Sequence, residues 1–316
     1  MSDKSQRVSA SAPGKLMISG EYAVLEGAIA IVASVDVRAH ARWTDDTTAT
    51  LPPEARETRK LAELALGTVS GQLEIDASDL RKSGRKLGLG SSAAASAAVA
   101  GALLASNGHD LHDAKVQQRA LELALAGHKA IAPEGSGADV AAASLGGFVR
   151  FRLEGGKLAE AVRVDFPLGL ATRVVWTGKE ARTSDFVRAV REFEGRDPHG
   201  FGLIRDELRD RAAHFADAIA RGDVHEVVAA ASKYGLGMGQ LGRSAGVDIV
   251  TAELAQIARL AELHGGAAKP SGAGGGDVAI ALFPSASNAL AFDVACAEAG
   301  LDRLDLKLGA PGVRAE

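Results

Sequence analysis

The stretch from Leu87 to Ser106 constrains the fold most, because it places two glycines directly before a long run of small, helix-compatible residues. Gly88 and Gly90 allow backbone conformations in which a Cβ would clash. Ser91 or Ser92 is expected to cap the following helix, whose free N–H groups and positive dipole end attract phosphate without a charged side chain. The two hydroxyls could also reach a magnesium ion or a phosphate oxygen. A capped, alanine-rich core helix without a ligand is the alternative.

The same stretch also fits the G-x-G-x-x-A fingerprint of dinucleotide-binding folds. That fingerprint requires a buried strand before the glycines and a strand ending in an acid after the helix. The preceding segment, 81–86, is polar, and the following segment, 107–128, reads as another helix. A nicotinamide site is therefore disfavoured. The sequence also lacks a G-x-x-x-x-G-K-[ST] phosphate loop.

Composition narrows the class of protein. The 316 residues suffice for two ordinary domains or one large one, and 36 basic against 40 acidic residues give a net charge of −4. This balance disfavours nucleic acid as a partner but permits a local basic pocket. A single cysteine, Cys296, excludes a disulfide framework. Because no apolar run spans a membrane and MSDKSQR lacks a signal core, we expect a soluble, cytoplasmic protein without membrane contact.

Hydrophobic periodicity predicts alternating strands and helices along the chain. Pro13-Gly14 reads as a turn between two extended pieces, which would aim Lys15 from a fixed backbone corner. Strict alternation over Val35–Trp43 predicts a half-buried strand. Further strands are expected at 71–76, 148–152, 158–166, 170–176 and 278–283, and further helices at 54–66, 111–128, 185–194, 202–221, 223–241 and 248–263.

An irregular stretch at 129–147 contains another candidate for a functional turn. Ser136 and Gly137 provide flexible backbone, and Asp139 begins a second small-residue segment. Asp139 is interpreted either as a helix N-cap or as a carboxylate placed for chemistry.

Two later loops carry similar signals. The loop at 177–184 is dense in hydrogen-bond donors, which is typical of an exposed loop or of a pocket for an anionic substrate at a helix start. Gly274, Gly275 and Gly276 run straight into the strand at 278–283. They permit close approach of the backbone to a ligand or to another domain, and a glycine-rich linker is the alternative.

Three motifs in this order resemble the GHMP kinase superfamily of small-molecule kinases. They are APGKLMISGEYAVLEG, GLGSSAAAS and KPSGAGGGDVAIAL. Within that superfamily, GSGADVAAASLGG and WTGKEARTSDFV resemble the phosphomevalonate kinases of bacterial type. Mevalonate kinases usually carry an acidic magnesium ligand eleven positions before the equivalent of Asp139, where this chain has His128. The difference favours the phosphomevalonate branch.

The resemblance implies a two-domain α/β (α+β) fold. Residues 1–165 would form a ribosomal-S5-like, nucleotide-binding domain, and residues 166–316 a ferredoxin-like domain, with the active site in the cleft. The implied reaction transfers the γ-phosphoryl group of ATP, with Mg²⁺, to 5-phosphomevalonate, giving the 5-diphosphomevalonate of isoprenoid biosynthesis by the mevalonate pathway. The alternatives are a related kinase acting on mevalonate, homoserine or a sugar, and a non-catalytic member that only binds. A monomer or homodimer is expected.

The resemblance also implies roles for residues. Lys15 would bridge the acceptor and the transferring phosphoryl group, Asp139 would orient Lys15 or assist the acceptor, and Ser92 would contact magnesium. The other nucleotide-binding residues would be Lys86, Gly88, Leu89, Gly90, Ser91 and Ala93. The other substrate-binding residues would be Glu21, Tyr22, Ser136, Gly137, Lys179, Arg182, Thr183, Ser184, Lys269, Ser271, Gly272, Gly274 and Gly275, with Lys179 and Arg182 on the 5-phosphate.

Overall fold

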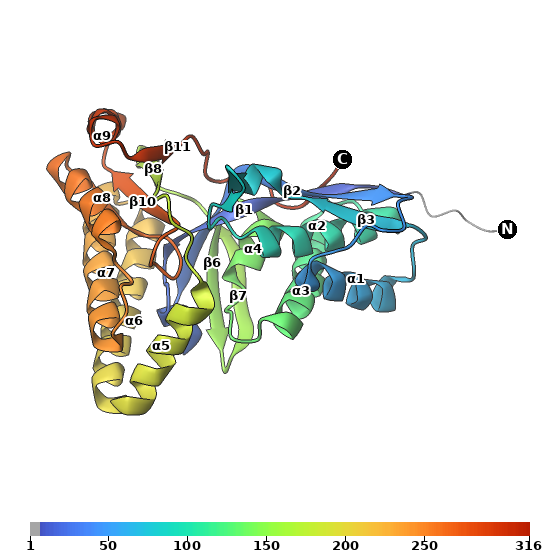
Figure 1. Cartoon of the computed structure of the whole chain (residues 1–316), viewed down its shortest axis with the longest axis horizontal. Helices are drawn as coiled ribbons and strands as arrows, with labels where there is room; N and C mark the ends of the chain where they lie inside the picture. Colours follow the sequence, from blue (N-terminus) through green and yellow to red (C-terminus); the bar gives the residue numbers. More distant parts are fainter. Residues whose placement is uncertain (1–6) are drawn as a thin grey trace. The chain divides into compact units, whose positions relative to one another are not determined.

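The computed structural model describes residues 7–316 and contains two long strands, β1 (Ala10–Ser19) and β2 (Ala30–Thr44), which are labelled in Figure 1. Each of these strands contributes residues to two structural units. Neither unit is continuous in sequence, and a domain boundary at 165/166 stays a prediction. The expectation of no signal core falls largely on residues 1–6, outside the described residues. The first unit comprises residues up to Leu16, Val32–Val149 and Lys307–Glu316, and the second comprises Met17–Ile31 and Arg150–Leu306.

In the first unit, the strand order is β12 (Arg314–Ala315), β1, β2 and the first residues of β6 (Phe148–Glu154). The strand β3 (Gln72–Asp76) pairs antiparallel with the far end of β2. The strand predicted from strict alternation is confirmed as part of β2. Arg38 departs from the pattern, because its guanidinium is buried and donates to the hydroxyl and the carbonyl of Ser11. Burial lowers the pKa of Arg38 to about 10.

The predicted turn at Pro13-Gly14 is wrong, because β1 runs through this dipeptide without a break. A Cβ on Gly14 would lie 2.6 Å from Cδ2 of Leu80 and 2.8 Å from the carbonyl oxygen of Leu89. Gly14 is therefore needed for close approach of neighbouring segments rather than for a turn. Lys15 therefore lies within an unbroken strand, and its own backbone N–H donates to the Leu89 carbonyl at 2.9 Å.

Four α-helices lie in the described part of the first unit, and α2 (Ser91–Ser106) is buried along almost its whole length. It packs against α1 (Pro53–Leu66), α3 (Ala114–Ile131) and α4 (Ala138–Leu145). Alanines on all sides of α2 allow this close packing. The polar segment before α2 forms a short exposed hairpin, β4 (Arg81–Lys82) and β5 (Arg85–Lys86).

The C-terminal segment returns to the first unit and fastens the end of α4. The Arg38 guanidinium donates to the carbonyls of Pro311 and Gly312 at 2.9 and 2.7 Å. The backbone N–H of Val313 donates to the carbonyl of Ser144, the penultimate residue of α4, at 3.1 Å. Residues far apart in the sequence thus hold the helix that carries Asp139.

The second unit contains an antiparallel sheet of order β11 (Asp302–Leu304), β8 (Ala171–Trp176), β10 (Val278–Phe283), β9 (Ala267–Pro270) (Figure 1). A hairpin of β6 and β7 (Lys157–Val164) precedes this sheet in the chain. The helices are α5 (Thr183–Arg196), α6 (Pro198–Arg221), α7 (Val224–Ala245), α8 (Ala252–Leu263) and α9 (Ala286–Glu298).

Two apolar cores organise this unit. One core joins α5, α6 and α7 to a short helical turn, η1 (Ala23–Glu26). The other joins α8 and α9 to the sheet, and it includes Cys296 as a small packed side chain. Helices packed on an antiparallel sheet are the arrangement that a ferredoxin-like domain implies. Between residues 7 and 316, no helix has both the length and the apolar character needed to cross a bilayer.

Candidate functional site

The glycine loop leaves the N-terminus of α2 open. Gly88 and Gly90 adopt positive φ angles of 75° and 74°, and Gly90 itself is the N-cap of α2. The prediction that Ser91 or Ser92 caps the helix is wrong, because both lie inside its first turn and no side chain caps it. The first N–H groups of α2 have no acceptor within the helix. They are therefore available to an anion.

Lys15 lies directly on this loop. Its ammonium donates to the carbonyl of Gly88 at 3.3 Å, and its side chain covers Gly90 so closely that a Cβ there would lie 2.8 Å from Lys15 Cγ. No carboxylate forms an ion pair with Lys15 within the described part of the chain. The structure thus places an uncompensated cation at Gly90, the residue from which α2 begins.

Ser92 faces a buried histidine on α3. The Oγ of Ser92 lies 3.5 Å from Nε2 of His128, and Nδ1 of His128 is buried without a hydrogen-bond partner among residues 7–316. The sequence had marked His128 only as a replacement for an acid, and its position opposite Ser92 was not predicted. The signal that could have found it is its place on the buried face of α3.

Asp139 lies in the first turn of α4, whose N-cap is Gly137 with a φ of 85°. The interpretation of Asp139 as an N-cap is therefore wrong. Its carboxylate is partly buried and accepts from the backbone N–H of Val140 at 2.9 Å. No ion pair joins Asp139 to Lys15. Ser136 accepts a hydrogen bond from the backbone N–H of Ala138 at 3.2 Å.

In the second unit, Glu21 and Lys269 form an ion pair that is almost completely enclosed. The Glu21 side chain is 2% exposed and the Lys269 side chain 0%. Ser271 is also buried, and its hydroxyl has no partner among the described residues. Tyr22, next to Glu21, donates to the carbonyl of Ala273 in the glycine-rich loop. Burial, reinforced by the charge of Glu21, raises the pKa of the Tyr22 phenol.

The donor-rich loop at 177–184 is fixed to the glycine-rich loop through Asp277. The Asp277 carboxylate accepts from the backbone N–H of Ala181 at 3.0 Å, and its carbonyl accepts from the backbone N–H of Thr177 at 2.9 Å. Lys179 is exposed and pairs with Glu253, whose pKa this hydrogen bond lowers to about 2. The remaining predicted contacts are exposed at the start of α5: Arg182, Thr183 and Ser184.

The glycines of the later loop are needed within their own unit. A Cβ on Gly274 would lie 2.2 Å from the Ile249 carbonyl oxygen, and one on Gly275 would lie 1.9 Å from the Phe186 ring. The predicted close approach of the backbone is therefore made to protein atoms. Gly272 is partly exposed and has a φ of 101°.

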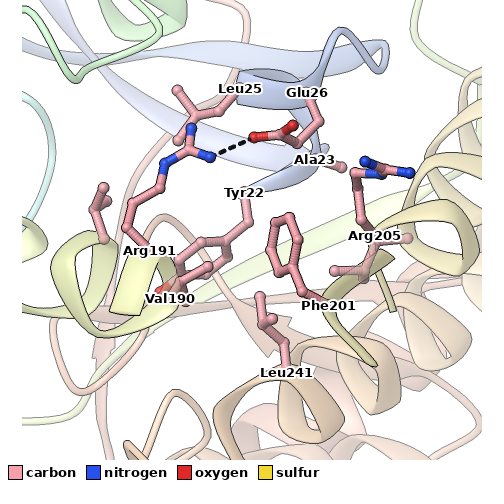
Figure 2. Close-up of a pocket in the computed structure, with 11 residues that line it drawn as sticks. Tyr22, Ala23, Leu25, Glu26, Val190, Arg191, Phe201, Arg205 and Leu241 are labelled. Carbon is pink, nitrogen blue, oxygen red and sulfur yellow. Dashed lines mark hydrogen bonds and ion pairs between the residues drawn. The ribbon is translucent and has the colours of Figure 1, made fainter. Parts of the chain in front are cut away.

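A small apolar pocket lies between η1 and helices α5, α6 and α7 (Figure 2). It holds about 20 Å³ of free space, enough for one water molecule. Figure 2 shows the Arg191 guanidinium paired with Glu26 at its edge. Tyr22 is the one predicted site residue in its lining, so this pocket is not the predicted substrate site.

Two family models match the chain. Residues 59–147 match the model described as GHMP kinases N terminal domain, and residues 215–298 match the model described as GHMP kinases C terminal. A phosphomevalonate kinase from Streptomyces sp. (strain CL190) is 30% identical, over 86% of this chain and 88% of the relative. The chain is a GHMP kinase. The predicted family and the predicted two-domain α/β fold are confirmed.

This GHMP kinase is a homologue of phosphomevalonate kinase with weaker similarity to mevalonate kinases. A mevalonate kinase from Thermococcus gammatolerans is 25% identical over 90% of this chain and 92% of the relative. The solved Streptococcus pneumoniae phosphomevalonate kinase in complex with phosphomevalonate and AMPPNP superimposes with a TM-score of 0.81 at 21% identity, over 95% of this chain and 99% of that chain. At that identity, the solved structure shows a shared fold.

Proposed function

We propose that this GHMP kinase transfers the γ-phosphoryl group of ATP to the phosphate of 5-phosphomevalonate, giving ADP and 5-diphosphomevalonate. The observation that carries the proposal is the unpaired ammonium of Lys15 on the glycine loop that opens α2. The Streptomyces relative and the ligands of the Streptococcus structure support the choice of donor and acceptor. A cytoplasmic location and a monomeric or homodimeric state are part of the proposal.

The chemistry explains why a cation matters more than a base. An oxygen of the acceptor phosphate forms a bond to the γ-phosphorus while the bond from that phosphorus to the bridging oxygen of ADP breaks. The second pKa of a phosphate monoester is about 6, so the attacking oxygen is already ionised at neutral pH. The main obstacle is repulsion between two anions, which fixed positive charge relieves. We assign this task to Lys15.

The residues at the mouth of α2 suit the nucleotide phosphates. We assign Gly88, Leu89, Gly90 and the first N–H groups of α2, including those of Ser91, Ser92 and Ala93, to the ATP phosphates. Lys86, on the exposed hairpin before the loop, adds positive charge. Asp139 assists the acceptor rather than pairing with Lys15, because the two side chains form no ion pair.

Magnesium fits this site as an ion that arrives with the nucleotide. Within residues 7–316, no three His, Cys, Asp or Glu side chains are grouped to hold a metal. Mg²⁺ prefers oxygen ligands, keeps several waters and is often held by one or two protein groups plus phosphates. The Ser92 hydroxyl is such an oxygen. When bound, the ion would neutralise phosphate charge.

On the acceptor side, the exposed donors around the start of α5 are the groups that we assign to the substrate phosphate. Lys179 and Arg182 supply charge, and Thr183 and Ser184 supply hydroxyls at a helix N-terminus without a side-chain cap. Ser136 and Gly137 precede α4 and hold Asp139 in place. Ser271, Gly272, Gly274 and Gly275 shape the acceptor pocket, with Tyr22 bonded to the same loop.

An acceptor panel tests the proposal directly. Release of ADP is measured with phosphomevalonate, mevalonate, homoserine and galactose, and the product is identified by ³¹P NMR as a diphosphate or a monophosphate. We expect turnover with phosphomevalonate and a diphosphate product. Turnover with mevalonate instead would overturn the substrate assignment and leave the fold untouched. Nucleotide binding without ADP release for any acceptor would identify a non-catalytic member.

A further inference from the structure

The enclosed ion pair between Glu21 and Lys269 is the feature that the phosphoryl-transfer chemistry leaves unexplained. The two residues lie 248 positions apart, one just after β1 and the other in β9. The Lys269 ammonium also donates to the carbonyl of Pro270 at 2.8 Å and lies 5.7 Å from the centre of the Tyr234 ring. At this burial, neither charge is free to bind a substrate directly.

The surrounding structure accommodates this pair specifically. Gly235 on α7 leaves room for Lys269, since a Cβ there would lie 3.2 Å from Lys269 Cβ. Tyr234 on the same helix donates to the backbone carbonyl of Glu21 at 2.8 Å. Apolar residues of similar volume often replace a buried ion pair without loss of stability. Stability alone therefore does not require two charges here.

The pair fixes two segments that both carry proposed acceptor residues. On one side, Tyr22 follows Glu21 with a φ of 60°, a strained conformation for a side chain of this size. On the other side, Lys269 leads into the glycine-rich loop at 271–276. The hydroxyl of Tyr22 joins the two by donating to the Ala273 carbonyl.

Two buried polar atoms at this junction lack a hydrogen-bond partner among the described residues. They are the Oε2 oxygen of Glu21 and the hydroxyl of Ser271. Buried polar atoms are rarely left in this state, so each needs a water or a ligand group. The Glu21 carboxylate and the Ser271 hydroxyl can therefore each form a further hydrogen bond next to the glycine-rich loop.

The geometry points to Glu21 and Lys269 as positioning residues for the acceptor. Their ion pair holds the Tyr22 turn against the glycine-rich loop, and this junction sets the affinity for the acceptor without setting that for ATP. The assignment rests on the proposed function, because it requires that the loop at 271–276 binds the acceptor. It replaces the direct substrate contacts that the sequence had implied for Glu21 and Lys269.

Three variants test this assignment: Lys269→Met, Glu21→Gln and the double variant Glu21→Gln/Lys269→Met. The double variant removes both charges, so no unpaired ion remains to destabilise the fold. We expect its KM for phosphomevalonate to rise about tenfold or more, while its KM for ATP stays within about twofold. Amide hydrogen exchange at residues 271–276 should accelerate in the same variant. The matched control is Arg173→Met/Asp293→Asn, which removes a half-buried pair between β8 and α9 and should change neither KM.

The outcomes separate the two proposals. Turnover of phosphomevalonate by the unaltered protein tests the proposed function alone, and if another acceptor is used, the same KM comparison is made with that acceptor. A double variant with unchanged acceptor KM and unchanged exchange overturns the positioning role. If the double variant does not fold, Tyr22→Phe decides, because it removes only the bond to Ala273. Unchanged exchange at 271–276 in that variant would equally overturn the assignment.

Discussion

Two lysines of this GHMP kinase sit in opposite electrostatic settings. Lys15 is partly exposed, bonded to a carbonyl and without a carboxylate partner in the described chain. Lys269 is fully buried, its charge is neutralised by Glu21, and its ammonium donates to the carbonyl of Pro270. A cation that must attract a ligand anion has to remain uncompensated until the anion arrives. A cation that holds protein segments together is compensated by the protein itself.

The helix N-termini show the same contrast. Side chains cap α3, α6, α7, α8 and α9, whereas α2, α4 and α5 begin without a side-chain cap. Of the four uncapped α-helices in residues 7–316, these three carry predicted site residues, and the fourth, α1, begins at a proline. The open ends of α2 and α5 leave N–H groups and dipoles for phosphates. At α4, the Ser136 hydroxyl and the Asp139 carboxylate accept from the N–H groups of Ala138 and Val140. A side chain that caps a helix satisfies some of these donors itself.

Removing one member of the buried pair should give the largest effect on stability. Lys269→Met leaves Glu21 charged, buried and unpaired, so the free energy of unfolding should fall by about 3–5 kcal/mol. Urea unfolding followed by circular dichroism measures the change. Glu21→Gln/Lys269→Met should recover most of the loss.

The control for this prediction is Lys233→Met, which alters an exposed lysine on α7 whose nearest acid lies 4.0 Å away. It should change the unfolding free energy by less than about 0.5 kcal/mol. Equal losses in Lys269→Met and Lys233→Met would remove the electrostatic distinction between the buried lysine and a surface lysine.

Removing the unpaired lysine should act on rate instead of stability. Lys15→Met should lower kcat/KM by about 10²–10³, the effect of losing a single preorganised electrostatic donor. The melting temperature should change little, because no carboxylate is left without its partner. The measurement is ADP release with phosphomevalonate beside a thermal melt.

The control here is Lys60→Met, an exposed lysine on α1 that pairs with Glu57. Its activity should equal that of the unaltered protein. If kcat/KM of the Lys15→Met enzyme stays within about threefold of the wild-type value, the role proposed for Lys15 in relieving anion repulsion is contradicted.

Local sequence signals predicted most of the elements, because side-chain periodicity reports which face of a strand or helix is buried. The strand over Val35–Trp43 and the helices from α5 to α8 were found in this way. The turn predicted at Pro13-Gly14 does not form, because contacts to Leu80 and Leu89 override the local preference of this dipeptide. Such cases are decided by tertiary contacts, and a local stretch of sequence does not reveal which distant residues make them.

The local geometry of the candidate site was predictable to a similar extent. The glycine loop and Lys15 belong to motifs that can be recognised in the sequence, and the structure brings the two together. Caps at Gly90 and Gly137 were assigned to neighbouring polar residues, because glycine offers no side chain to signal a cap. The pairing of Glu21 with Lys269 spans 248 positions, so no local pattern could state that each neutralises the other.

A change in the loop under Lys15 should have an intermediate effect. Gly90→Ala forces a Cβ into left-handed backbone, which costs roughly 1–2 kcal/mol, and pushes it toward Lys15 Cγ. We expect kcat/KM to fall about tenfold because Lys15 is displaced. Gly84→Ala is the matched control, since Gly84 has a φ of 78° but no atom within 4 Å of the added Cβ. It should share the loss of stability and keep full activity; equal loss of activity in both would mean that strain alone is responsible.

The smallest effect should come from a third lysine, Lys179, which is exposed but already paired with Glu253. The pair lowers the pKa of the Glu253 carboxyl from 4.5 to about 2, so its stabilising contribution is present above pH 4.5 and is lost as the pH falls toward 2. In the proposed acceptor site, Glu253 would compete at neutral pH with the substrate phosphate for Lys179.

Glu253→Gln should therefore lower the KM for phosphomevalonate about two- to threefold at low salt, with the KM for ATP unchanged, and the effect should fade as salt screens the exposed charge. Glu192→Gln, an exposed acid on α5 that lies 4.0 Å from Arg188, is the control and should leave both KM values unchanged. A rise in the acceptor KM of Glu253→Gln would mean that the carboxylate orients Lys179 for the acceptor. Lys179 would then resemble Lys269, a cation that depends on its protein partner, more than Lys15.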